Sequence, residues 1–301
     1  MKTKIFVRSY GRSEMVQEQT LKFLMAQKDL NLQEQLHLIV HEDELETYQK
    51  ALKDFPVAKF ITKTEKGGHN SIKAMHEFLE PDEPFLLLDD DLGKCPHYVG
   101  SVSKETKQDL DCLGAYIEYA EEQLKKCGGR FWSIKPLQNM NWVAQKPFAE
   151  HRPGFVLGFW FGGFNHPSIL TEFAHNDDVI RSARITEKFG GVLLFNWVCL
   201  DTFVIETHPG GMQGSGDRGA AEERKAHTKR ISDACYEIPV VKKFCEPPDY
   251  EESRGMWRVK LKSMTKVKKL INVKKVTWKT YFQEDADNVN DPIQNMFGGS
   301  L

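Results

Sequence analysis

Three consecutive aspartates, Asp89 to Asp91, follow four large apolar residues in the segment PFLLLDDDLGK. Adjacent carboxylates repel one another and raise each other's pKa, so such a cluster needs a compensating partner. In an extended chain alternate side chains point the same way, so Asp89 and Asp91 could hold one divalent cation. Ligation by oxygen alone suits Mg²⁺ or Mn²⁺. A solvated turn at a strand end and a buried carboxylate pair that shares a proton are the alternatives.

A second acidic motif, in HNDDVIRSARI, places Asp177 and Asp178 at the start of an expected helix. A cation at the first motif would neutralise the diphosphate of a nucleotide-sugar as its sugar leaves. Acidic residues at the start of a helix are typical of helix capping, which is the plain interpretation of this motif.

Three further segments offer groups that could bind a nucleotide. Arginines near the end of the first expected strand could contact phosphate, and HEDE could accept hydrogen bonds from a base or ribose. The segment KGGHN precedes a helix, whose backbone N–H groups could face the donor. The candidates are Arg8, Arg12, Glu42, Lys66, Gly67, His69 and Asn70. Taken singly, each could belong to an ordinary surface loop.

The elements that must position these residues alternate strictly through the first ninety residues. We expect strands over 4–10, 35–43, 57–62 and 84–88, and helices over 13–27, 45–55 and 70–80. Such alternation predicts βαβ units and a mainly parallel sheet flanked by helices, an α/β fold. Ligands bind outside the carboxyl ends of the strands in such sheets, so the three aspartates should lie on the binding edge.

The rest of the chain is less regular. We expect mostly helix over 95–131, strands and loops laid over the site across 131–164, a helix within 168–191 and one or two strands within 192–207. A glycine-rich segment with a helical second half follows. Pro247 and Pro248 mark the expected boundary between a domain, 1–246, and a C-terminal extension, 247–301.

The extension is basic, with ten lysines or arginines and no acidic residue from Arg254 to Lys279. A solvated basic surface, an acidic membrane surface and contact with a phosphate backbone are the three interpretations.

The composition, with 40% hydrophobic and 11% aromatic residues in 301, is sufficient for a large core. The six scattered cysteines form no C-x-x-C pair and are expected to be reduced thiols of a cytoplasmic protein. The longest apolar stretch, FVLGFWFGGF, is about half a membrane span and is expected in the core, so we expect no stable membrane insertion.

In their order and spacing, IFVRSYGR, KGGHN, LLLDDDL, NDDVIRSARI and HPGGMQ resemble the GT-A glycosyltransferases over about residues 4–240. Within that fold the chain most resembles the DNA base glycosyltransferases associated with TET-type pyrimidine hydroxylases, which include the base J glucosyltransferase and phage relatives. The resemblance implies a Rossmann-like GT-A domain, a nucleotide-sugar donor such as a UDP-sugar, and Mn²⁺ or Mg²⁺. It also implies a cytoplasmic location, that of the host if the protein is viral.

The resemblance further implies roles for individual residues. Asp89, Asp90 and Asp91 would contact the metal and the donor diphosphate, and Asp177 or Asp178 would be the base. His208 would complete the metal site, with His227 as the alternative, and Arg218 would contact the diphosphate. Gly162 and Gly163, in FGGFN, would form a loop near the acceptor; Trp142, in the polar and aromatic segment QNMNW, is a further candidate acceptor contact.

The resemblance favours DNA as the partner of the basic extension, through Arg258, Lys260, Lys262, Lys268 and Lys269. The leading hypothesis is a metal-dependent enzyme that moves a sugar onto a hydroxymethyl-pyrimidine base, in a single strand or turned out of the duplex. A GT-A enzyme acting on a glycan, protein or lipid is the alternative, and a non-catalytic DNA-binding protein is the second alternative. The sugar, the nucleotide and the stereochemistry stay open.

Overall fold

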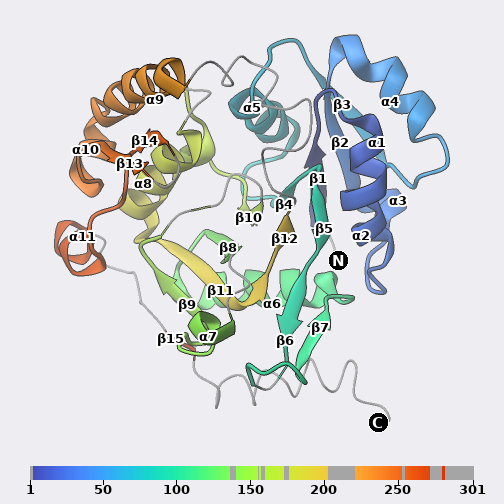
Figure 1. The fold of residues 1–301 in the computed structure, drawn as a ribbon. Coiled ribbons are helices and arrows are strands. Elements are labelled where there is room, and N and C mark those ends of the chain that lie inside the picture. Colours follow the sequence, from blue (N-terminus) through green and yellow to red (C-terminus); the bar gives the residue numbers. More distant parts are fainter. Residues whose placement is uncertain are drawn as a thin grey trace.

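The computed structural model describes residues 3–99, 101–135, 140–154, 156, 160–172, 176–202, 221–252, 255–271 and 280–281. A central sheet flanked by helices forms the fold, so the expected α/β class is confirmed (Figure 1). The strands lie in the order β15-β9-β11-β8-β10-β4-β1-β2-β3, and β6 and β7 extend from β11.

The N-terminal half of the sheet is wholly parallel, as the alternation predicts. Its strands are β1 (Lys4–Arg8), β2 (Leu36–His41), β3 (Lys59–Lys63) and β4 (Pro84–Asp89). Its helices are α3 (Leu32–Gln35), α4 (Leu45–Ala51) and α5 (Gly68–Phe78), with η2 (Glu42–Glu44) as a 3₁₀ turn. The register places Arg8 directly beside Asp89, so the carboxyl ends of β1 and β4 meet at one edge.

The single helix expected over 13–27 is interrupted by a π-helical turn. It consists of α1 (Ser13–Val16), η1 (Gln17–Leu21) and α2 (Lys22–Met25). The π turn contains Thr20, whose hydroxyl donates to the Asp89 carbonyl oxygen at 2.7 Å. A contact 69 residues away along the chain thus accompanies the irregularity, and helical periodicity alone could not predict it.

The C-terminal half of the sheet is mixed rather than parallel. Strand β10 (Trp160–Phe164) runs antiparallel to both β4 and β8 (Phe131–Lys135). Strand β11 (Val192–Cys199) is parallel to β8, whereas β9 (Ala149–Arg152) is antiparallel to β11 and pairs with β15 (Thr280–Tyr281). Two short elements, α7 (Met140–Val143) and η3 (Pro167–Ile169), connect these strands.

The expectation of mostly helix over 95–131 is wrong for the first part of that range. The chain forms β5 (Leu92–Lys94), β6 (Pro96–Tyr98) and β7 (Lys107–Asp109) before helix α6 (Leu113–Cys127) begins. Strand β5 pairs with β12 (Asp201–Thr202), and β6 pairs with β11. The pairing partners of β5 and β6 lie about a hundred residues away in the sequence. The short segments that form these strands therefore carry no local pattern that predicts the pairing.

The glycines Gly162 and Gly163, expected in a loop near the acceptor, lie inside β10 instead. Gly163 pairs with Phe85, near the start of β4, whereas the aspartates follow the end of that strand. A Cβ atom on Gly162 would lie 2.4 Å from Nε1 of Trp132, so this glycine makes room for a buried indole. Close packing therefore requires glycine at position 162, and the acceptor role of Gly162 and Gly163 stays a prediction.

A hydrophobic cluster joins the C-terminal elements to helix α8 (Asp177–Phe189). These elements are α9 (Ala221–Tyr236), α10 (Pro239–Phe244) and α11 (Met264–Leu270). Strands β13 (Asp249–Glu251) and β14 (Met256–Arg258) form a hairpin beside α9, where Ser232 Oγ donates to the Trp257 carbonyl oxygen at 3.2 Å. Ile180, Phe244 and Val267 are fully buried in this cluster, so packing continues across the expected boundary at Pro247. In Figure 1, α9 and α10 (orange) lie beside α8.

All six cysteines are buried, and none forms a disulfide. No helix in the described ranges combines the length and the apolar composition needed to cross a membrane.

We predict that Gly162→Ala lowers the free energy of unfolding by about 1–3 kcal/mol, because the new methyl group overpacks the site of the Trp132 indole. Urea denaturation measures this loss. Gly255→Ala is the control: Gly255 has a φ of 61°, and a Cβ atom there would meet no neighbouring heavy atom within 4 Å, so it reports backbone strain without a clash. A Gly162→Ala protein as stable as the wild type would contradict the buried position.

Candidate active site

Arg8 connects three elements at the carboxyl edge of the parallel strands. Its Nε donates a hydrogen bond to Oδ1 of Asp89, its register partner on β4. Its Nη1 lies 3.5 Å from the carbonyl oxygen of Gly68, in the first turn of α5. Sequence analysis predicted that both charged residues lie at this edge, and the structure brings them into contact.

Asp90, the middle aspartate, is an anchor inside the protein. Ser9 Oγ donates to its Oδ2 at 2.6 Å, and Arg12 Nη1 donates to its Oδ1 at 3.2 Å. Tyr48 extends the network: its Oη lies 2.6 Å from Ser9 Oγ and accepts the Arg12 backbone N–H at 3.0 Å. Burial and the charge of Asp89 raise the pKa of Asp90, while Ser9 and Arg12 limit the rise. Asp90 therefore supports Arg12 and the turn.

Asp89 and Asp91 are more accessible than the aspartate between them. Their side chains are each 26% exposed, against 7% for Asp90. Burial, followed by the charges of Asp89 and Asp90, raises the pKa of Asp91 to about 7. Arg12 opposes this rise from 3.9 Å, measured between Nη1 and Asp91 Oδ2. The negative charge of the cluster is thus only partly compensated by protein groups.

Thr20 holds the aspartate turn from both ends. Its hydroxyl donates to the Asp89 carbonyl oxygen and accepts the backbone N–H of Leu92 at 3.0 Å. Thr20, Ser9 and Tyr48 were not among the residues predicted from the sequence. The signal available was a polar side chain on an otherwise apolar face, since all three are buried.

An aromatic and cationic group lies beside this edge, at the ends of β1 and β2. The rings of Tyr10 and His41 meet edge to face at 5.9 Å, and Lys66 Nζ lies 5.3 Å from the centroid of the Tyr10 ring. Asn70 donates to the Lys66 carbonyl oxygen at 2.8 Å, which closes the turn into α5. Tyr10 was missed from the sequence, although it follows Arg8 closely in the same strand segment.

The other predicted donor-binding residues lie around this group. Gly67 has a φ of 107°, a conformation that favours glycine, and precedes α5. His69 is in the first turn of α5, and Glu42 is exposed in η2.

The second acidic motif opens α8, and its two aspartates have different surroundings. Asp177 Oδ2 accepts a hydrogen bond from Nη2 of Arg181 at 2.5 Å, and Arg181 is fully buried. Burial opposes ionisation of Asp177, but the charges of Arg181 and Arg8 prevail and lower its pKa. Arg181 Nε also donates to the Ile169 carbonyl oxygen at 3.2 Å, which fixes the guanidinium. Asp177 is therefore an ionised, structurally committed carboxylate.

The pKa of Asp178 is shifted in the opposite direction to that of Asp177. Burial and the charge of Asp177 raise its pKa, and Arg181 and the Val179 N–H oppose the rise. Its Oδ1 accepts that N–H at 2.9 Å, so Asp178 satisfies one of the free donors at the helix start. Asn176, the residue before the helix, makes no capping hydrogen bond with its side chain. Of the two candidates, Asp178 is the better proton acceptor.

The charges of both acidic motifs act on one guanidinium. Burial would lower the pKa of Arg8, yet the pKa is raised, by Asp89 first and by Asp177 and Asp90 as well. Asp89 makes the direct contact with Arg8, and Asp177 acts on it through its charge.

Four other predicted residues are His208, Arg218, Trp142 and His227. The first two lie outside the described residues, and Trp142 lies in α7. His227 is on α9, where its Nδ1 lies 3.3 Å from Nη2 of Arg230. In the part of the chain that the structure describes, no three His, Cys, Asp or Glu side chains are arranged to hold a metal ion. The ligand set Asp89, Asp91 and His208 therefore stays a prediction.

The cations assigned to DNA are largely engaged within the fold. Arg258 pairs with Glu251 at 3.1 Å, and Lys260 lies 3.9 Å from Asp249. Lys262 donates to the carbonyl oxygens of Lys242 and Lys243 at 2.9 and 2.8 Å. Lys268 and Lys269 lie in the last turn of α11. Local partners thus reduce the positive field expected from the sequence.

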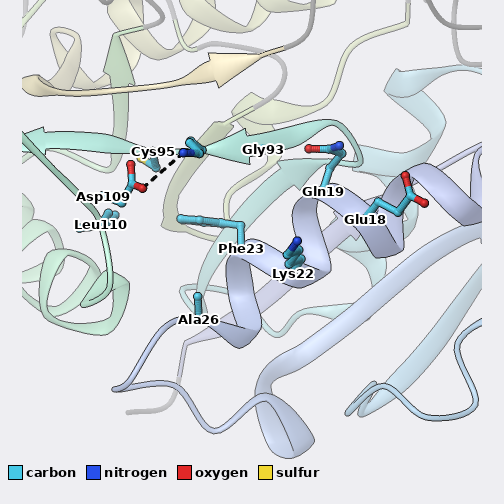
Figure 2. A pocket seen from close by; sticks show the side chains of 10 residues that line it. Glu18, Gln19, Lys22, Phe23, Ala26, Gly93, Cys95, Asp109 and Leu110 are labelled. Atoms are coloured by element: carbon cyan, nitrogen blue, oxygen red, sulfur yellow. Dashed lines mark ion pairs between the residues drawn. The ribbon is translucent and has the colours of Figure 1, made fainter.

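A cavity of about 520 Å³, whose lining does not include Asp89, Asp90 or Asp91, lies between η1 and α2 on one side and β5 and β7 on the other. Its floor is apolar, formed by Phe23, Cys95 and Leu110. Figure 2 shows Asp109 and Leu110 at one end and Glu18 at the other.

No model of a known protein family matches the chain, and no curated protein matches it. Among solved structures, Staphylococcus aureus TarS 1-349 in complex with UDP-GlcNAc has a TM-score of 0.45 and 15% identity, over 85% of this chain and 69% of that one. TarS 1-349 with UDP has a TM-score of 0.42 and 13% identity, over 66% of this chain and 59% of that one.

A UDP-glucose pyrophosphorylase complexed with UDP-glucose has a TM-score of 0.38 and 10% identity, over 67% of this chain and 92% of that one. Because all three TM-scores are below 0.5, neither the activity nor the acceptor of this chain follows from these likenesses.

The raised pKa of Asp91 leads to a pH-dependent prediction. Between an unfolded-state pKa of about 4 and the folded value of about 7, the native protein binds more protons, so the contribution of Asp91 to stability falls as the pH rises. Without divalent cations, Asp91→Asn should therefore raise the free energy of unfolding at pH 8 by on the order of 2 kcal/mol, and the gain should vanish near pH 4.

Urea denaturation in EDTA at several pH values measures this difference. Asp54→Asn, at an exposed carboxylate, is the control and should show no comparable trend. An Asp91→Asn gain that is absent, or equal at every pH, would contradict the raised pKa.

Proposed function

We propose that the protein is a metal-dependent glycosyltransferase that moves a sugar from a nucleotide-sugar onto an acceptor hydroxyl group. The observation that carries this proposal is the pair of acidic motifs around Arg8, at the carboxyl edge of β1 and β4. Sugar transfer needs negative charge compensated at the leaving diphosphate and a proton acceptor at the incoming hydroxyl. The first motif offers partly exposed carboxylates for a cation at the diphosphate, and the second offers a carboxylate with a raised pKa as the proton acceptor.

The residues of the first motif fit a divalent cation. Asp89 and Asp91 offer partly exposed carboxylate oxygens, the ligands that Mg²⁺ and Mn²⁺ prefer. Burial and the charges of Asp89 and Asp90 raise the pKa of Asp91, and a cation bound beside these carboxylates would offset that repulsion. We propose that Mn²⁺ or Mg²⁺ would be held by Asp89, Asp91 and His208. The bound cation would stabilise the negative charge that develops on the diphosphate.

The nucleotide would bind at the neighbouring strand ends. Tyr10 offers a ring face for a base, and Lys66 and the first turn of α5 offer positive charge and backbone N–H groups for ribose or phosphate. We propose UDP as the nucleotide, with Arg218 as a further diphosphate contact.

Asp178 would act as the general base. Its carboxylate takes the proton of the acceptor hydroxyl, the acceptor oxygen forms a bond to the anomeric carbon, and the bond from that carbon to the diphosphate oxygen breaks. A raised pKa makes a carboxylate a stronger proton acceptor near neutral pH than an ordinary aspartate. Asp177, paired with Arg181, would keep the start of α8 in place.

We propose that the acceptor is a hydroxymethyl-pyrimidine base in DNA. Val267 of α11 packs in the same cluster as α8, and the charge of Arg258 on β14 partly offsets the rise in the pKa of Asp178, which supports the proximity of these basic elements to Asp178. A DNA strand bound to β14 and α11 would lie close to Asp178, the proposed general base. The engaged lysines predict modest affinity for DNA, with base recognition at the site contributing the rest.

Incubation with labelled UDP-sugars and Mn²⁺ tests the reaction and the acceptor together. We expect label in hydroxymethylated DNA and none in unmodified DNA of the same sequence. Transfer to a glycan, protein or lipid extract, but to neither DNA, would select the alternative enzyme class. Failure to release any nucleoside diphosphate with Mn²⁺, together with DNA binding, would support a non-catalytic DNA-binding protein.

Two neighbouring substitutions separate chemistry from structure. Asp178→Asn should lower kcat at least about 100-fold, because the proton acceptor is lost, while UDP affinity stays nearly unchanged. Asp177→Asn should instead lower the free energy of unfolding by about 3–5 kcal/mol, because it leaves the buried Arg181 without its anionic partner.

Steady-state kinetics, UDP titration and urea denaturation on both variants check this pattern. A stable, inactive Asp177→Asn beside an active Asp178→Asn would reverse the assignment.

A further inference from the structure

We propose that Arg8 is a positioning residue that occupies Asp89 in the donor-free protein and turns to the donor diphosphate when a divalent cation binds Asp89. The inference rests on the proposed function, because it requires a cation and a diphosphate at this edge. It assigns to Arg8 a change of partner rather than a fixed contact.

The contact between Arg8 and Asp89 competes directly with a metal ion. Arg8 Nε donates to Oδ1 of Asp89, so one of the two carboxylate oxygens is already used. The guanidinium also places a positive charge beside the carboxylate, and this charge repels a divalent cation that approaches Asp89. Binding of a cation to Asp89 is therefore weaker while Arg8 remains there.

The guanidinium of Arg8 lies against the first turn of helix α5. Its Nη1 lies 3.5 Å from the Gly68 carbonyl oxygen, at the outer limit of a hydrogen bond, and the side chain is 16% exposed. A Cβ atom on residue 68 would lie 2.7 Å from Nη1, so glycine is required for this close approach. A diphosphate bound at the positive end of this 11-residue helix would therefore lie within reach of the guanidinium.

Arg8 stays protonated in either arrangement, because a guanidinium does not lose its proton in proteins. The negative charge of Asp177 also acts on Arg8 and would attract the guanidinium once Asp89 is released. Arg12 lacks this freedom, because Asp90 holds its guanidinium and Tyr48 holds its backbone N–H. Of the two arginines predicted to contact the donor, Arg8 is the one that can change partners.

A change of partner predicts opposite effects on two ligands. Arg8→Gln frees Asp89, so Mn²⁺ alone should bind about tenfold more tightly, whereas UDP in saturating Mn²⁺ should bind about tenfold more weakly. A merely structural role of Arg8 would weaken both.

The experiment titrates the full-length protein with Mn²⁺ while free Mn²⁺ is followed by electron paramagnetic resonance. A second titration with UDP in saturating Mn²⁺ uses calorimetry. Arg152→Gln is the matched control, since Arg152 Nε pairs with Glu150 at 2.7 Å on β9, four strands from β4; both affinities should stay unchanged. Arg8→Lys, which keeps the charge, should shift both affinities in the same directions by a smaller factor and replaces Arg8→Gln if that variant unfolds.

Opposite shifts would support the exchange. Mn²⁺ affinity that is unchanged or weaker in the Arg8 variants, with a wild type that binds Mn²⁺, would overturn it and leave the proposed function intact. Unchanged UDP affinity would overturn the transfer to the diphosphate. A wild-type protein that binds no Mn²⁺, with or without UDP, would overturn the metal site and this inference together.

Discussion

The ion pair between Arg8 and Asp89 is the contact on which the site depends, and the core of the sheet fixes it. The two residues are register partners at the ends of β1 and β4, and the buried pairs Ile5 with Leu86 and Val7 with Leu88 precede them. A shift of one residue in this pairing would turn each apolar side chain to the other face of the sheet. Hydrophobic burial therefore sets the position of the charges, and the charges in turn set where a ligand can bind.

Both acidic motifs divide their work between neighbouring residues. In the first, Asp90 is buried and holds Ser9 and Arg12, while Asp89 and Asp91 remain partly exposed. In the second, Asp177 is committed to Arg181, while burial and the charge of Asp177 raise the pKa of Asp178. An anchored carboxylate next to a more basic one gives each motif a fixed position and a reactive group.

The sequence was sufficient to predict the parallel half of the sheet and the edge where the aspartates lie, because buried apolar strands and amphipathic helices leave strong local patterns. It did not predict β5 to β7 or the antiparallel β10, whose pairing partners are distant or whose glycines resembled a loop. Thr20 and Tyr48 were missed for the same reason. Their hydroxyl groups belong to the site only through contacts with residues far away in the chain.

A crystal structure with Mn²⁺ and UDP, with anomalous scattering recorded for manganese, tests the site most directly. We predict an anomalous peak in direct contact with the carboxylates of Asp89 and Asp91, the diphosphate beside it, and Asp178 on the opposite side of the space left for a sugar. A peak at other residues, or UDP bound away from the ends of β1 and β4, would contradict the assignment of this edge as the donor site.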